Sequence, residues 1–146
     1  MIYRHYIDGK WVESHSGKTF ESSNPANGEV VGVLGKAGPR EVDEAVESAA
    51  RAFPQWRRVP APKRAEILFR AAETLVKRKE ELSILMTREM GKVIAESRGD
   101  VQEGIDMTYY MAAEGRRQFG QVVPAEMPNK FALSLRDPIG VAAAIT

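Results

Sequence analysis

Acidic side chains in residues 89–106 are the first candidates for chemistry. They lie at mostly helical spacing, at Glu89, Glu96, Asp100, Glu103 and Asp106. A carboxylate site for two metals in a helical bundle needs Glu-x-x-His pairs on facing helices. The surrounding block, residues 63–119, contains no histidine. We therefore interpret the group as a solvated acidic helix face, and the sequence predicts no metal site.

Glycines cluster between a predicted strand and a predicted helix, at Gly28, Gly32, Gly35 and Gly38. The dinucleotide fingerprint needs G-x-G-x-x-G, and the P-loop needs a lysine followed by Ser or Thr. Here the glycines recur every third or fourth residue, and Lys36 is followed by Ala37. We interpret this stretch as an ordinary strand-to-helix turn.

Groups for nucleophilic catalysis are scarce in this sequence. The 146 residues include no cysteine, which excludes disulfides, thiolate metal ligands and a cysteine nucleophile within them. The two histidines, His5 and His15, lie beside predicted hairpin turns, and spacing identifies no partner for either. The sequence alone therefore predicts no catalytic residue.

Two hairpins are expected at the start of the chain. Residues 6–12 predict the first, because Asp8-Gly9 suits a two-residue type I′ turn. Residues 19–23 and 29–34 predict the strands of the second. A helix should begin at Pro39 and stop at Pro54. Its expected buried stripe, with Trp56 folded back onto the core, consists of Val42, Ala45, Val46, Ala49, Ala50 and Phe53.

Helical spacing in residues 63–119 predicts two or three packed helices, with a break at residues 77–81 and glycine punctuation at Gly91 and Gly99. Residues 131–136 then alternate as in a strand. Residues 139–146 form an unbroken run of small and apolar side chains, which is typical of a strand buried in a parallel sheet. The sequence offers this strand no parallel neighbour.

Composition indicates a globular protein of at most one domain, with 43% hydrophobic residues. The net charge is +1, from 21 basic and 20 acidic residues, and gives no electrostatic footprint for nucleic acid or an acidic membrane. No apolar run approaches the ~20 residues of a spanning helix, and the first residues do not form a secretory signal. We expect a cytoplasmic protein.

An ordered set of short segments carries a family resemblance. It consists of Tyr6-Ile7-Asp8-Gly9-Lys10-Trp11, Asn24-Pro25-Ala26-Asn27-Gly28-Glu29-Val30, Ala45-Val46, Ala52-Phe53, Trp56, Arg64, Ile67-Leu68, Glu89-Met90-Gly91-Lys92, Tyr109-Tyr110 and Pro138-Ile139-Gly140-Val141. In this order, and spread over nearly the whole chain, the segments resemble the N-terminal part of the NAD(P)-dependent aldehyde dehydrogenase superfamily.

The resemblance implies an α/β fold: N-terminal hairpins and helices, with the dinucleotide-binding parallel sheet truncated after its first strand. Residues 1–129 would be the N-terminal part of the cofactor-binding domain. Residues 130–138 would be a strand of the oligomerisation arm, and residues 139–146 the first strand of the incomplete sheet.

The resemblance also implies an NAD or NADP cofactor, bordered by Ile145 and Thr146, and an aldehyde tunnel faced by Gln102 and Glu103. An exposed helix face is an equally good interpretation of the last two. Family members use thiolate attack on the aldehyde, hydride transfer to nicotinamide and thioester hydrolysis. The residues for these steps come later in the family, so this chain alone should be inactive.

Three hypotheses follow. The first is a fragment of a homo-oligomeric dehydrogenase that acts on a small-molecule aldehyde, with no nucleic-acid or membrane partner. The second is a natural, non-catalytic assembly module that associates with a full-length relative. The third, an unrelated small α+β enzyme, is disfavoured because no nucleophile–base pair is present.

Overall fold

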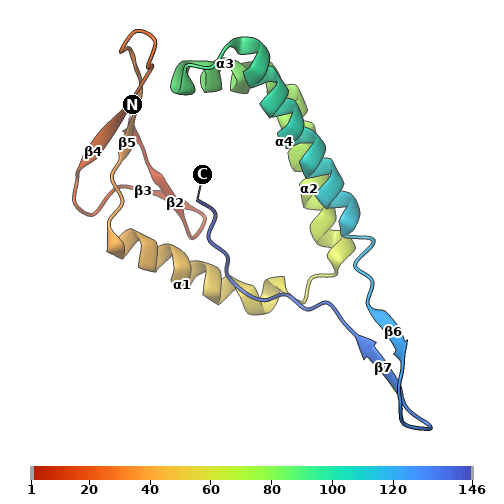
Figure 1. Cartoon of the computed structure of the whole chain (residues 1–146). Coiled ribbons are helices and arrows are strands. Elements are labelled where there is room, and N and C mark those ends of the chain that lie inside the picture. The colour runs from red at the N-terminus through yellow and green to blue at the C-terminus, as the bar shows by residue number, and fades with distance from the viewer. Residues whose placement is uncertain (1, 146) are drawn as a thin grey trace.

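Strands make up the N-terminal part of the structure, a computed structural model that describes residues 2–145 (Figure 1). Strands β2 (His5–Ile7) and β3 (Lys10–Val12) form an antiparallel hairpin. A separate three-stranded sheet has the order β1-β5-β4, from β1 (Ile2–Tyr3), β4 (Thr19–Ser23) and β5 (Val30–Gly35). Strand β5 pairs parallel with β1 and antiparallel with β4.

The predicted hairpins are confirmed. Asp8 and Gly9 both have positive φ, 52° and 75°, as a type I′ turn requires. Strand β4 has the expected bounds, and β5 is shifted by one residue from those expected. Strand β1 was not predicted, because two residues carry too little pattern and their partner strand lies 31 positions away, as in the pair Ile2–Val33.

Four helices follow: α1 (Pro39–Trp56), α2 (Ala61–Lys77), α3 (Lys79–Met90) and α4 (Ile94–Glu114). The predicted break falls at Arg78, and α3 ends at Gly91, one of the two glycines expected to punctuate the block. Gly91 adopts the left-handed conformation that is common at helix ends. Two expectations were wrong. Gly99 lies inside α4, and Pro54 lies inside α1, two residues before the helix ends at Trp56, so the hydrogen bond that its nitrogen cannot donate is lost only in the last turn.

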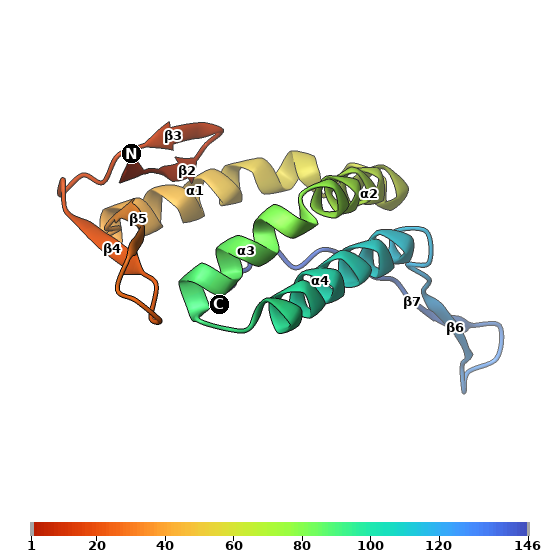
Figure 2. The same ribbon diagram turned by 90° about the horizontal axis from the view of Figure 1, so that it is seen from above.

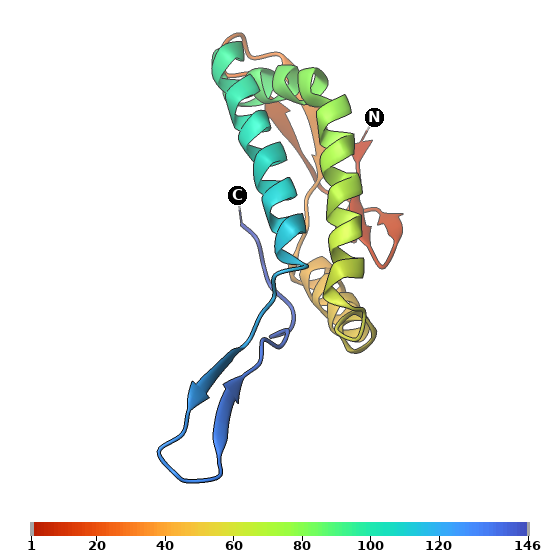
Figure 3. The same cartoon turned by 90° about the vertical axis from the view of Figure 1, so that its right-hand side faces the viewer.

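The core lies between α2 and α4, which run side by side with α3 across one end (Figures 2 and 3). Its buried apolar side chains are Ala65, Ala72, Val101, Ile105 and Ala112. A Cβ atom added at Gly115 would lie 2.5 Å from Ala65 Cβ. Small residues thus allow α2 and α4 to approach closely. None of the four helices among residues 2–145 has the length and apolarity to cross a bilayer.

The stripe predicted to be buried on α1 is mostly exposed. Val42 is 55% exposed, Val46 49% and Trp56 46%, and only Phe53 of the stripe is half-buried. The helix lies apart from the α2–α4 core (Figure 1). Periodicity correctly identified the apolar face of α1, but it cannot indicate whether the described residues provide a cover for that face.

A protruding hairpin, the arm, follows the helices (Figure 3). It pairs β6 (Gln121–Pro124) with β7 (Phe131–Ser134). Strand β7 falls within the strand expected at residues 131–136, whereas β6 was missed. The strand expected at residues 139–146 is not formed: residues 139–145 have no ladder partner, and Thr146 lies outside the described residues. A strand exists only where a neighbour pairs with it.

Candidate functional site

The tunnel candidates Gln102 and Glu103 lie together on α4. Both line a shallow surface hollow whose other lining residues are Gly99, Asp106, Met107 and Tyr110. Gln102 accepts a hydrogen bond from Lys79 Nζ at 2.7 Å and donates one to Asp106 Oδ1 at 2.8 Å. The amide of Gln102 is therefore held in place by α3 on one side and by its own helix on the other.

The α4 hollow is polar at one end and apolar at the other. Met107 is 50% exposed and Tyr110 is 55% exposed, so both present apolar surface to a ligand. The adjacent Tyr109 instead packs on Phe69, with ring centroids 6.3 Å apart. The two adjacent tyrosines therefore have different surroundings: Tyr109 packs towards the α2–α4 core, and Tyr110 lines the hollow. These groups can line and orient a small molecule, but they supply no nucleophile with a base.

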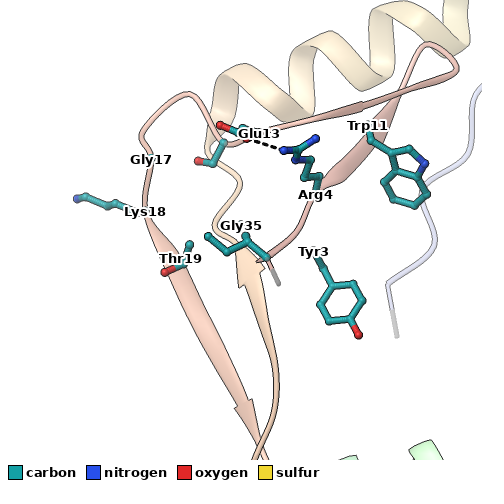
Figure 4. A pocket seen from close by; sticks show the side chains of 10 residues that line it. Tyr3, Arg4, Trp11, Glu13, Gly17, Lys18, Thr19 and Gly35 are labelled. Carbon is teal, nitrogen blue, oxygen red and sulfur yellow. Dashed lines mark hydrogen bonds and ion pairs between the residues drawn. The ribbon is translucent and has the colours of Figure 1, made fainter.

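A second hollow, which sequence reasoning missed, lies among the N-terminal strands (Figure 4). Its volume is about 770 Å³. The rings of Tyr3 and Trp11 lie on one side of it, and two other lining residues form an ion pair, Arg4 Nη2 with Glu13 Oε1 at 2.9 Å. The signal available in the sequence was Trp11 in the first predicted hairpin, whereas Tyr3 lies on β1, which local sequence does not predict. In the structure the Tyr3 and Trp11 side chains are 57% and 66% exposed.

The expectation that neither histidine has a partner was wrong for His15. Its Nε2 lies 3.0 Å from Glu44 Oε1, and its backbone N–H donates to Glu41 Oε1 at 2.7 Å. Two backbone hydrogen bonds lower the pKa of Glu41 to about 2, the larger effect coming from the Gly38 N–H and the smaller from the His15 N–H. His5 Nε2 is buried, with no hydrogen-bond partner among the described residues.

The residues described here do not form an NAD(P) site by themselves. Ile145 is 97% exposed in the unpaired run, and Thr146 lies outside the described residues. The N-terminus of α1, which follows the glycine cluster, is already occupied by an anion: Glu41 Oε2 accepts from Gly38 N–H at 2.8 Å. A phosphate would meet that carboxylate. Within residues 2–145 no cluster of three His, Cys, Asp or Glu side chains could hold a metal.

The fold and its sequence match a known class of oxidoreductase. The aldehyde dehydrogenase family matches residues 11–146. The chain is 42% identical, over 98% of its length, to malonate-semialdehyde dehydrogenase 2 of Geobacillus kaustophilus, and 38% identical, over 97%, to glutarate-semialdehyde dehydrogenase of Pseudomonas putida. It spans only 30% and 29% of those two proteins.

Solved structures give the same result. The succinate-semialdehyde dehydrogenase of Burkholderia pseudomallei superposes with a TM-score of 0.89 at 34% identity, covering 94% of this chain and 29% of that one. An NAD-dependent aldehyde dehydrogenase from Sinorhizobium meliloti gives a TM-score of 0.84 at 32% identity, covering 91% and 27%. An E. coli NADP-dependent enzyme superposes with a TM-score of 0.85 at 32% identity, covering 89% of this chain and 27% of that one.

The chain belongs to the aldehyde dehydrogenase family and corresponds to its N-terminal portion. It has the α/β architecture of that portion.

Proposed function

We propose that these residues are the N-terminal portion of an NAD(P)-dependent dehydrogenase that oxidises an aldehyde to a carboxylic acid through a cysteine thioester. The observation that carries the proposal is the continuous match of residues 11–146 to the family. When bound, the nicotinamide nucleotide would supply the hydride acceptor. The thiolate is not among these 146 residues, which contain no cysteine.

The chain's own residues would position and line rather than react. In the whole enzyme, Gln102 and Glu103 would face the path of the aldehyde, supported by the hydrogen bonds of Gln102 to Lys79 and Asp106. Residues 139–146 would become the first strand of the dinucleotide-binding sheet, with Ile145 and Thr146 beside the cofactor. Residues 130–138 would belong to the arm through which the enzyme forms a homo-oligomer.

The substrate class to test first is a semialdehyde, an aldehyde that carries one carboxylate at its other end. Relatives named for the semialdehydes of malonate, glutarate and succinate support this choice. A net charge of +1 supports small-molecule partners over nucleic acid.

The activity test uses the purified 146-residue chain with NAD⁺ or NADP⁺ and a panel of semialdehydes. We expect no aldehyde-dependent formation of NADH or NADPH. A second measurement determines the intact mass of the native protein in its source cells, where an antibody to α2–α4 detects it. A product several times heavier than 16.2 kDa supports the proposal. A product of 16.2 kDa would favour the non-catalytic assembly module, and steady turnover by the short chain would contradict both.

A further inference from the structure

We infer that the ion pair between Arg57 and Asp137 is a latch that fixes the direction in which the arm leaves the helical body. Arg57 Nη2 lies 2.7 Å from Asp137 Oδ2, and the two residues are 80 positions apart. The chain returns from β7 past α1 at this point (Figure 1). The latch therefore stands where the arm ends and the apolar run of residues 139–145 begins.

Among the described residues, no second side-chain hydrogen bond or ion pair ties the arm to the helical body. Within residues 2–145, this pair is the one hydrogen bond or ion pair between side chains that joins residues 121–145 to residues 2–115. Other bonds of this segment stay local, such as Arg136 Nε to the Phe119 carbonyl at 3.3 Å. All residues of β6 and β7 are exposed, so apolar packing does not fix the arm's direction either.

Both partners of the latch are held in place by their own segments. Arg57 is the C-cap of α1, where the negative end of the helix dipole favours a cation, and its guanidinium lies 5.6 Å from the centroid of the Phe53 ring. Pro138 restricts the preceding Asp137 to extended backbone. The side chains are 42% and 70% exposed, so salt can weaken the pair.

Distances between spin labels test the latch. The chain has no cysteine, so Glu73→Cys on α2 and Glu126→Cys in the arm loop give two unique label sites. Labelled chain is diluted into unlabelled chain, so that distances within one molecule dominate. In this background, Arg57→Gln and Asp137→Asn should each broaden the distance distribution. In each variant, we expect the population of the native arm position, relative to other positions, to fall by about two- to fivefold, which matches the strength of an exposed ion pair.

The matched control is Arg58→Gln, which removes the same charge from an exposed neighbour that makes no side-chain ion pair within the described residues. It should leave the distribution unchanged. The charge reversal Arg57→Asp with Asp137→Arg should restore the narrow distribution, and about 1 M salt should broaden the unsubstituted chain but not Arg57→Gln. Narrow distributions in both single variants would overturn the latch. Equal broadening by Arg58→Gln would overturn it too, because the effect would then be one of net charge.

Discussion

Glu41 links two segments that are distant in sequence. Its carboxylate accepts backbone hydrogen bonds from Gly38, at the start of α1, and from His15, in the β3–β4 loop. These bonds lower the pKa of Glu41 from 4.5 to about 2. A depressed pKa in the folded state means that the stabilisation is fully present above about pH 4.5. It is then lost as the pH falls from 4.5 towards 2.

Replacing Glu41 by Gln should therefore lower the denaturant midpoint at neutral pH and flatten the pH dependence of stability below pH 4.5. Urea unfolding followed by circular dichroism, at neutral pH and at pH 3, measures both effects. Glu47→Gln on the same helix is the control, because the Glu47 carboxylate is exposed and lies 4.0 Å from Arg51. Identical pH curves for the two variants would contradict this role of Glu41.

Sequence reasoning placed the start of α1 correctly at Pro39 but could not find the contacts of Glu41. The helix start is a local property, set by a proline and nearby acidic residues. The contact with His15 spans 26 positions, and no spacing rule connects a loop to a helix at that distance. The same limit explains why Gln102 and Glu103 could be placed on one helix while Lys79, the α3 partner of Gln102, was not foreseen.

At the scale of elements, two glycines show how context decides the effect of one substitution. Gly91 ends α3 with φ +74°, and an added Cβ would lie 2.7 Å from Pro25 Cγ. Gly99 lies inside α4, with nothing within 4 Å of an added Cβ. The first position needs glycine, because its conformation is strained for other residues. At position 99, glycine serves no such need and only lowers the helix propensity of α4.

We expect Gly91→Ala to destabilise the chain by at least about 1–2 kcal/mol. Gly99→Ala should stabilise it by about 0.5–1 kcal/mol. Chemical denaturation of the two variants beside the unsubstituted chain measures both changes. Equal effects of the same sign would show that the end of α3 does not depend on a left-handed residue.

Elements with long, regular patterns were predictable, and those that depend on distant partners were not. The bounds of β4 and the break at Arg78 follow from local sequence. Strand β1 has two residues, too few to show a pattern, and β6, Gln121–Pro124, lacks the alternation of apolar and small or polar side chains that is present in β7. The apolar residues of 139–145 have strand character, but a strand forms only when a neighbour supplies the hydrogen-bond ladder.

At the scale of the whole molecule, the exposed apolar surface is large. It includes Val42 and Val46 on α1, and Ile139 and Ile145 in the unpaired run, which are 98% and 97% exposed. Exposed apolar surface favours association, and an unpaired apolar segment can add to the edge of another sheet.

The isolated chain should therefore self-associate as its concentration rises. Sedimentation velocity should show species heavier than 16.2 kDa. The double variant Val46→Lys and Ile139→Lys should shift the distribution towards the monomer, because charges on both surfaces oppose contact. Gln55→Lys, which adds a charge at an exposed polar position of α1, should have little effect. A stable monomer of the unsubstituted chain at high concentration would contradict this expectation and favour a stand-alone module.

The α2–α4 core has a consequence for how the polypeptide folds during synthesis. Its three helices are consecutive, and their buried residues, from Ala65 to Ala112, come from one stretch of fewer than 60 residues. Contacts over such short separations form quickly, and N-terminal segments leave the ribosome first. The helical core can therefore assemble from its own residues while the arm and everything beyond it are still being translated.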